Sequence, residues 1–268
     1  MQTTIAVDGV SLEGAWFGEK SPDAPTIVLL HEGLGSVSTW RAFPERLAHA
    51  THARVFVYSR AGYGQSAPVR LPRPVDYLRR EAIDVLPKLL DAIGFRRGIL
   101  LGHSDGGSIA AIYAGSTQDH RVRGLVLIEP HFFVEEFNLA SIRKIANEYK
   151  TTDLRTRLAR HHVDPDATMQ GWLDFWLNPE FKSFDMRDEL QHIRVPILFI
   201  KGENDPYGTV AQIQVAEAEC YCPVEATIVP NARHAPHHDQ PETTMALITD
   251  FINRLWAHES QPLQAAQP

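Results

Sequence analysis

The segment Gly102-His-Ser-Asp-Gly106 fits the pattern G-x-S-x-G and follows the apolar run Ile99–Leu101. A strand that turns sharply into a helix strains the turn residue and leaves room only for glycine on either side. We therefore expect Ser104 at the carboxyl edge of a sheet, where ligands bind in open α/β folds. The Asp105 N–H, at the start of the helix, is then the nearest donor for a developing oxyanion. This spacing indicates a nucleophilic serine, with an ordinary glycine-rich turn as the alternative.

A serine hydroxyl needs a general base, and the base needs an acid that orients it. Asp205 follows an apolar run in Ile200-Lys-Gly-Glu-Asn-Asp205, and His234 follows the last apolar run of the chain. The carboxyl ends of parallel strands share one edge of a sheet, so Asp205 and His234 can meet Ser104 there. Glu129, at the end of another apolar run, is a rival acid. We predict Asp205 as the acid and His234 as the base.

Short apolar runs without alternation are typical of strands that are buried on both faces, as in a parallel sheet. Six such runs occur: Thr26–His31, Ala53–Tyr58, Gly98–Gly102, Gly124–Ile128, Val195–Ile200 and Ala226–Val229. Helical patterns separate them, at Val37–His49, Pro74–Ile93, Ser104–Gly115, Gly208–Ala218 and Pro241–Trp256. An antiparallel hairpin, Thr4–Val10 with Leu12–Gly18, precedes them. The order predicts an α/β fold with a doubly wound, mostly parallel, eight-stranded sheet.

The alternation of strands and helices stops between residues 131 and 192, which contain only charged amphipathic stretches such as Ala140–Tyr149. We expect this insert to form a helical cap over one end of the sheet. Residues 1–130 and 193–258 then form the core, and 259–268 a disordered tail. A cap must turn some apolar side chains toward the catalytic edge, and we expect Phe133, Trp172 and Trp176 to bind substrate there. Packing within the cap itself is the alternative role of its aromatic residues.

Composition narrows the class of protein. Hydrophobic residues make up 44% of the 268 positions, which suits a sizeable core. The net charge of −7 without a basic block excludes nucleic acid as an expected partner.

We see no signal peptide and no apolar run near the roughly 18 residues of a membrane span, so we expect a cytoplasmic protein. Cys220 and Cys222 are too close for an unstrained disulfide and are expected to be free. Oligomeric state is not indicated.

Taken together, these motifs resemble the α/β-hydrolase superfamily, whose triad follows the order Ser, Asp, His. Leu30-His-Glu-Gly-Leu-Gly35 and Arg60-Ala-Gly-Tyr-Gly-Gln-Ser66 also match its pattern, and the insert falls where the family places a cap. The resemblance implies a second oxyanion donor after His31. Aligned without a gap it is Gly33, which we favour; if Glu32 is an insertion, it is Leu34. We expect the Glu32 carboxylate to point away from the site or to pair with a cation.

We therefore expect a serine hydrolase that cleaves a small to medium carboxylic ester through an acyl-enzyme on Ser104, without a cofactor. The same triad also serves hydrolysis of a C–C bond in a ring-cleavage diketone, a lactone or a thioester. A non-catalytic ligand-binding member of the fold is the alternative from another class. Within the superfamily, dehalogenases and epoxide hydrolases carry an aspartate at the position of Ser104. His237 and His238 follow His234, but no second ligand cluster indicates a metal site.

Overall fold

The computed structural model describes residues 1–21 and 23–259. Within these residues one sheet of eight strands has the order β1-β2-β4-β3-β5-β6-β7-β8. Its strands are β1 (Gln2–Val7), β2 (Val10–Gly18), β3 (Thr26–Leu30), β4 (Arg54–Tyr58), β5 (Gly98–His103), β6 (Val122–Ile128), β7 (Ile197–Gly202) and β8 (Val224–Val229). β2 pairs antiparallel with β1 and β4, and the neighbours from β4 to β8 are parallel. The predicted doubly wound, mostly parallel sheet is confirmed.

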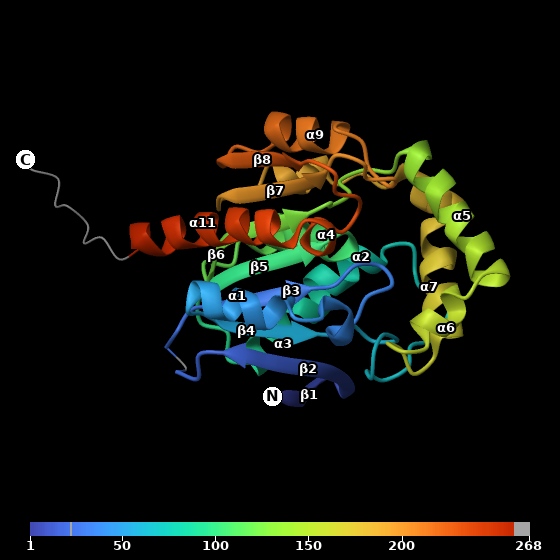
Figure 1. The fold of residues 1–268 in the computed structure, drawn as a ribbon, viewed down its shortest axis with the longest axis horizontal. Coiled ribbons are helices and arrows are strands. Elements are labelled where there is room, and N and C mark those ends of the chain that lie inside the picture. The colour runs from blue at the N-terminus through green and yellow to red at the C-terminus, as the bar shows by residue number, and fades with distance from the viewer. Residues whose placement is uncertain (22, 260–268) are drawn as a thin grey trace, which may run out of the picture.

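The central strands are buried on both faces, as expected of apolar runs without alternation. One face packs against α1 (Phe43–Thr51) and α11 (Pro241–Glu259). The opposite face packs against α2 (Tyr77–Arg80), a π-helical turn (Glu81–Val85), α3 (Leu86–Ala92), α4 (Asp105–Thr117) and α9 (Ala211–Glu219). Helices thus cover both faces, and the carboxyl ends of the parallel strands remain as the edge where a site can form (Figure 1).

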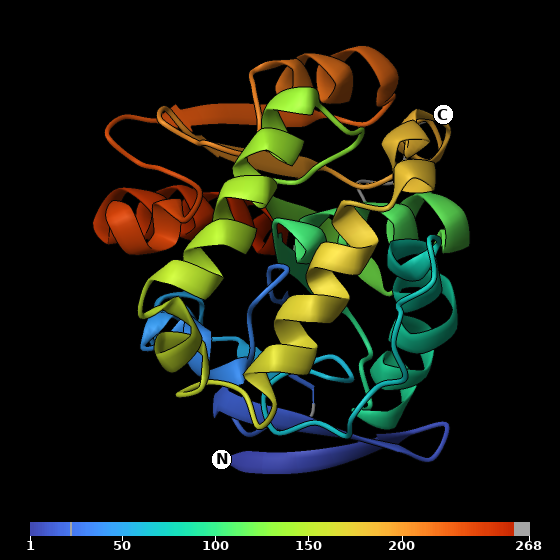
Figure 2. The ribbon, with the colours of Figure 1, turned by 90° about the vertical axis from the view of Figure 1, so that its right-hand side faces the viewer.

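The insert folds into helices that lie beyond this edge. They are α5 (Glu136–Thr151), α6 (Leu154–Leu158), α7 (Pro165–Trp176), a 3₁₀ turn (Pro179–Ser183) and α8 (Arg187–Leu190). Figure 1 shows α5, α6 and α7 on the right, past the strand ends, and Figure 2 shows α5 and α7 crossing in front of the sheet. The last helix, α8, returns to the core and packs against α4. The insert therefore closes over the edge that carries the predicted catalytic residues.

The segment that follows β3 forms two helical pieces instead of one. The predicted helix over Val37–His49 is a 3₁₀ turn (Val37–Trp40) followed by α1, because Arg41 has φ 53° and Pro44 favours a new helix start. A short helix, α10 (Pro236–Asp239), precedes α11.

Of the predicted disordered tail, Glu259 ends α11 and residues 260–268 lie outside the described residues. No helix in the described ranges has the length and apolar character that crossing a bilayer would require.

Candidate active site

Ser104 sits in a strained turn between β5 and α4. Its backbone has φ 52° and ψ −118°, in the region that favours glycine. A Cβ on Gly102 would lie 2.2 Å from the Gly106 carbonyl oxygen, and one on Gly106 would lie 2.0 Å from the Leu30 carbonyl oxygen. Both neighbours are backbone atoms, so both positions require glycine, as the sequence predicts. The turn holds the serine at the strand ends with its side chain beside a cavity.

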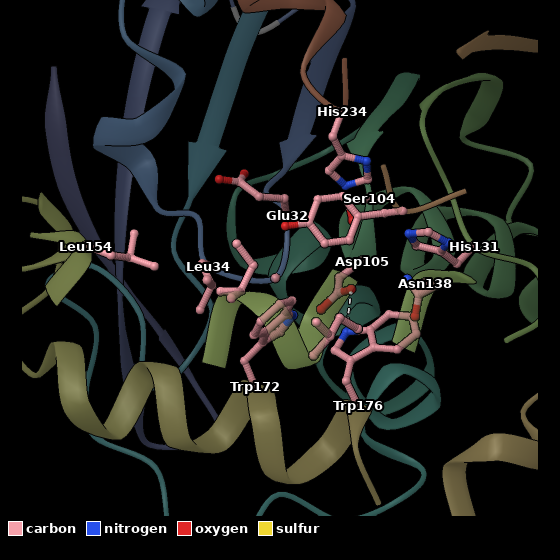
Figure 3. Close-up of a pocket in the computed structure, with 14 residues that line it drawn as sticks. Glu32, Leu34, Ser104, Asp105, His131, Asn138, Leu154, Trp172, Trp176 and His234 are labelled. Carbon is pink, nitrogen blue, oxygen red and sulfur yellow. Dashed lines mark hydrogen bonds between the residues drawn. The ribbon is translucent and has the colours of Figure 1, made fainter. Parts of the chain in front are cut away.

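His234 and Asp205 meet beside this serine. His234 Nδ1 lies 2.7 Å from Asp205 Oδ1, and His234 lines the same cavity as Ser104 (Figure 3). The Asp205 carboxylate also accepts bonds from Tyr207 N at 3.0 Å, Gly208 N at 2.8 Å and Lys201 Nζ at 3.2 Å. Burial acts to raise the pKa of Asp205, but the opposing effects of His234 and Lys201 hold that pKa well below its ordinary value. The Asp205 carboxylate is therefore ionised, and its bond to Nδ1 fixes the orientation of the imidazole.

Burial lowers the pKa of His234 below its ordinary 6.5, although the negative charge of Asp205 acts to raise it. The ring is therefore neutral near pH 7. With the proton on Nδ1 shared with Asp205, Nε2 carries the lone pair that a general base needs.

Glu129, the rival acid, takes a different position. Its carboxyl group contacts Lys201 Nζ at 3.2 Å and the Gly202 N–H, while the Nδ1 of His234 is taken by Asp205. Burial, and then the charge of Asp205, raises the pKa of Glu129 well above its ordinary value. Glu129 therefore supports Lys201 and the Asp205 turn instead of contacting the base directly.

Donor atoms of Glu129, Asp205 and His234 lie within 4.8 Å of one another, the group of metal-ligand type found among the described residues. The Lys201 ammonium donates to the carboxyl groups of both Glu129 and Asp205, so a positive charge already lies beside them. Asp205 and His234 also bind each other. This donor set therefore suits a catalytic pair better than a cation, and His237 and His238 are not part of it.

The loop after β3 is fixed by a fully buried arginine. Arg60 Nη1 donates to the His31 carbonyl at 2.6 Å, and Nη2 donates to the Glu32 carbonyl at 2.9 Å. His31 also donates from Nδ1 to the Glu32 carbonyl at 2.7 Å and accepts the Arg60 N–H at Nε2. Gly33 and Leu34 follow directly and line the cavity beside Ser104. Both candidates for the second oxyanion donor are thus in place.

Glu32 faces a histidine. Its Oε2 lies 3.6 Å from His103 Nδ1, and His103 Nε2 donates to the His234 carbonyl at 2.6 Å. Burial acts to raise the pKa of Glu32, but the interactions with His103 and His31 together outweigh it and hold that pKa below its ordinary value. Glu32 also lines the cavity, and the side chain that faces its carboxylate there is His103.

The cavity beside Ser104 has a volume of about 130 Å³. Trp172 and Trp176 of α7 line it, as predicted, and Trp176 Nε1 donates to Asp105 Oδ1 at 3.2 Å. Burial raises the pKa of Asp105 to about 6. The remaining apolar wall comes from α5 and α6, through Ile142, Ile145 and Leu154. The insert thus supplies most of the apolar surface above the serine.

The residues from 27 to 247 match the model of the Alpha/beta hydrolase family. The chain belongs to this family. It is 24% identical over 265 residues to epoxide hydrolase 3 of Xenopus tropicalis, a match over 85% of this chain and 71% of that protein. It is 29% identical over 212 residues to the human (Homo sapiens) serine hydrolase BPHL, with 75% of this chain and 69% of that protein covered.

The fold of this hydrolase also resembles the crystal structure of the enol-lactonase from Burkholderia xenovorans LB400. The TM-score is 0.74 at 20% identity, over 94% of this chain and 100% of that chain. At this level of identity the likeness concerns the fold. The relatives differ in the bonds that their names imply, so the chemistry of this hydrolase has to be argued from its own residues.

Of the predicted substrate-binding residues, Phe133 does not line the cavity. It forms an isolated bridge with Asp185, and its carbonyl accepts a bond from Gln212. The structure thus places Phe133 outside this cavity, where the insert leaves the core. Sequence reasoning missed His131, Asn138 and Tyr207, which do line the cavity. His131 and Tyr207 each follow a strand end closely, a position that could have been used to find them.

Proposed function

We propose that this hydrolase cleaves small to medium carboxylic esters through an acyl-enzyme on Ser104. The observation that carries the proposal is the 2.7 Å bond between His234 and Asp205 next to a strained serine at the strand ends. A serine at this position supports acyl transfer over the epoxide opening that the name of one relative implies, for which the superfamily uses an aspartate. A binding protein would have no need of the oriented histidine.

In the proposed reaction, His234 Nε2 takes the proton of Ser104 Oγ as the oxygen attacks the ester carbonyl carbon. The N–H groups of Asp105 and Gly33 donate to the oxyanion of the tetrahedral intermediate. His234 then protonates the leaving alcohol, and the acyl group remains on Ser104. A water molecule, deprotonated by His234, attacks the acyl-enzyme, and the acid leaves as Ser104 regains its proton. Asp205 stabilises the imidazolium at both stages.

The size and charge of the cavity support a small, uncharged substrate. A cavity holds a water once its volume exceeds about 10–15 Å³, so about 130 Å³ has room for a small organic group. Glu32 and Asp105 line the cavity, and no Lys or Arg is among the described residues that do so. A substrate carboxylate would therefore meet like charge, which disfavours acidic ring-cleavage products and favours a neutral ester.

The test is an assay of p-nitrophenyl esters from acetate to decanoate, with Ser104→Ala and the matched control Ser183→Ala. Ser183 is exposed, and its hydroxyl donates to the nearby Glu180 carbonyl. We expect short and medium esters to be turned over, with a loss of at least about 10³-fold in Ser104→Ala and none in Ser183→Ala. A fluorophosphonate probe should label Ser104. Turnover that survives in Ser104→Ala, or neither turnover nor labelling in the wild type, would refute the proposal.

A further inference from the structure

The cavity beside Ser104 carries polar atoms that the proposed reaction does not use. Asp105 Oδ2, His131 Nδ1 and Asn138 Oδ1 are buried without a hydrogen-bond partner in the part of the chain that the structure describes. Asp105 is 1% exposed, and His131 and Asn138 are each 2% exposed. All three residues line the cavity. Buried polar groups in folded proteins are paired as a rule, so three such groups around one cavity indicate a ligand that pairs with them.

These groups gather at one end of the cavity. Trp176 connects two of them, since its Nε1 donates to Asp105 Oδ1 and its ring packs edge-on against His131 at 5.4 Å. Figure 3 shows His131 and Asn138 on the right, Asp105 near the centre, and Leu34, Leu154 and Trp172 on the left, where Glu32 also lies. The three unpaired polar groups therefore lie away from Leu34 and Leu154. We call Asp105, His131 and Asn138 the polar end.

The chemistry of the polar end favours a group that both donates and accepts hydrogen bonds. Asp105 offers an acceptor, and the side-chain amide of Asn138 offers both a donor and an acceptor. Burial lowers the pKa of His131 to about 3, so its ring is neutral and also offers one donor and one acceptor. A hydroxyl group matches this set, since it donates one bond and accepts two. An ammonium group can only donate, and it would lose its hydration in a largely apolar cavity.

Resting on the proposed esterase function, we infer that the substrate is an ester with a hydroxyl group in its acyl or alcohol part. The hydroxyl binds the polar end, and the hydrocarbon part lies against Leu34, Leu154 and Trp172. A site built to bind a hydroxyl discriminates strongly against the analogue that lacks it, because its own buried groups then stay unpaired. The specificity of this hydrolase therefore resides in residues outside the triad.

The test compares kcat/KM for ethyl butyrate with that for ethyl 3-hydroxybutyrate, 2-hydroxyethyl butyrate and ethyl 3-aminobutyrate. We expect one of the hydroxylated esters to exceed ethyl butyrate by about tenfold or more. In Asn138→Leu, this ratio should fall to within about threefold of unity. Asn147→Leu is the matched control, with the same substitution at an exposed position of α5, and should keep the wild-type ratio.

Because the ratio is measured within one variant, a general loss of activity does not change its meaning. His131→Phe keeps an aromatic ring against Trp176 and serves as a second variant if Asn138→Leu does not fold. Equal rates on all four esters, a preference for the amino ester, or an unchanged ratio in both variants would overturn the inference. None of these results affects the proposed esterase. That proposal fails instead if no ester is cleaved and Ser104 is not labelled.

Discussion

Replacing Asp205 with asparagine changes one atom in a site where every position is fixed. Oδ1 accepts bonds from His234 Nδ1 and Tyr207 N, and Oδ2 accepts bonds from Gly208 N and Lys201 Nζ. In asparagine one of these two oxygens is replaced by an NH₂ group, which then faces hydrogen-bond donors in either orientation of the amide. Lys201 cannot become an acceptor, but the imidazole can, by moving its proton to Nε2. We expect the NH₂ to face His234 and the ring to adopt the wrong tautomer.

This tautomer has no lone pair on the side of Ser104, so the base is lost while the fold is kept. In serine proteases the same change lowers kcat by about 10⁴, which corresponds to about 5.4 kcal/mol of transition-state stabilisation. We expect a loss of this order in Asp205→Asn with little change in KM. The assay is steady-state hydrolysis of p-nitrophenyl butyrate at pH 8, with thermal unfolding to confirm the fold.

Glu129→Gln is the matched control, because it makes the same chemical change in the neighbouring carboxyl group. Burial raises the pKa of Glu129 well above its ordinary value, which favours the neutral acid that glutamine resembles. We expect the kcat of Glu129→Gln to stay within about tenfold of wild type, because the substitution acts through the contact between this side chain and Lys201. If Glu129→Gln lost as much activity as Asp205→Asn, or if Asp205→Asn stayed within tenfold, the assignment of the acid would be refuted.

Three further results are expected. Burial lowers the pKa of His234 below its ordinary 6.5 and the base must be neutral, so kcat/KM should fall toward low pH with its half-maximal point below pH 6.5. A half-maximal point above pH 7 in the pH–rate profile would contradict this. Gly106→Ala brings a Cβ to 2.0 Å from the Leu30 carbonyl oxygen, so we expect the free energy of unfolding to fall by about 2–3 kcal/mol and Tm by about 5–10 °C. An unchanged melting curve would count against the tight turn. Trp172→Ala enlarges the cavity and should move the preferred acyl chain in the p-nitrophenyl panel toward greater length; an unchanged optimum would place the acyl group elsewhere.

The core of the fold and the positions of the three proposed triad residues were predictable from the sequence because strand ends are easily located. Ser104, Asp205 and His234 each follow an apolar run within a few residues, and parallel strands bring such positions to one edge. The glycines around Ser104 added a second signal, since only close backbone contact requires them. These predictions depended on two local patterns, namely short apolar runs that mark buried parallel strands and glycines at the turns that follow them.

The insert was less predictable because amphipathic periodicity shows which residues share a face but not what that face contacts. Phe133 packs away from the cavity, whereas Trp172 and Trp176 line it. The start of α5 was also missed. Glu135 precedes this helix without a side-chain capping bond, so the sequence offers no start signal, and Asn138 fell outside the predicted helix. Of the three residues of the polar end, Asn138 could therefore not be found from the sequence.

The bond from Arg60 to the Glu32 carbonyl has an electronic consequence. That carbonyl and the Gly33 N–H belong to the same peptide group, and the carbonyl oxygen accepts from Arg60 Nη2 and from His31 Nδ1. A cation bonded to the oxygen of a peptide draws electron density through the amide bond and makes its N–H more acidic. Arg60, fully buried and always charged, therefore strengthens the Gly33 N–H as a donor through resonance, although Arg60 is not among the described residues that line the cavity.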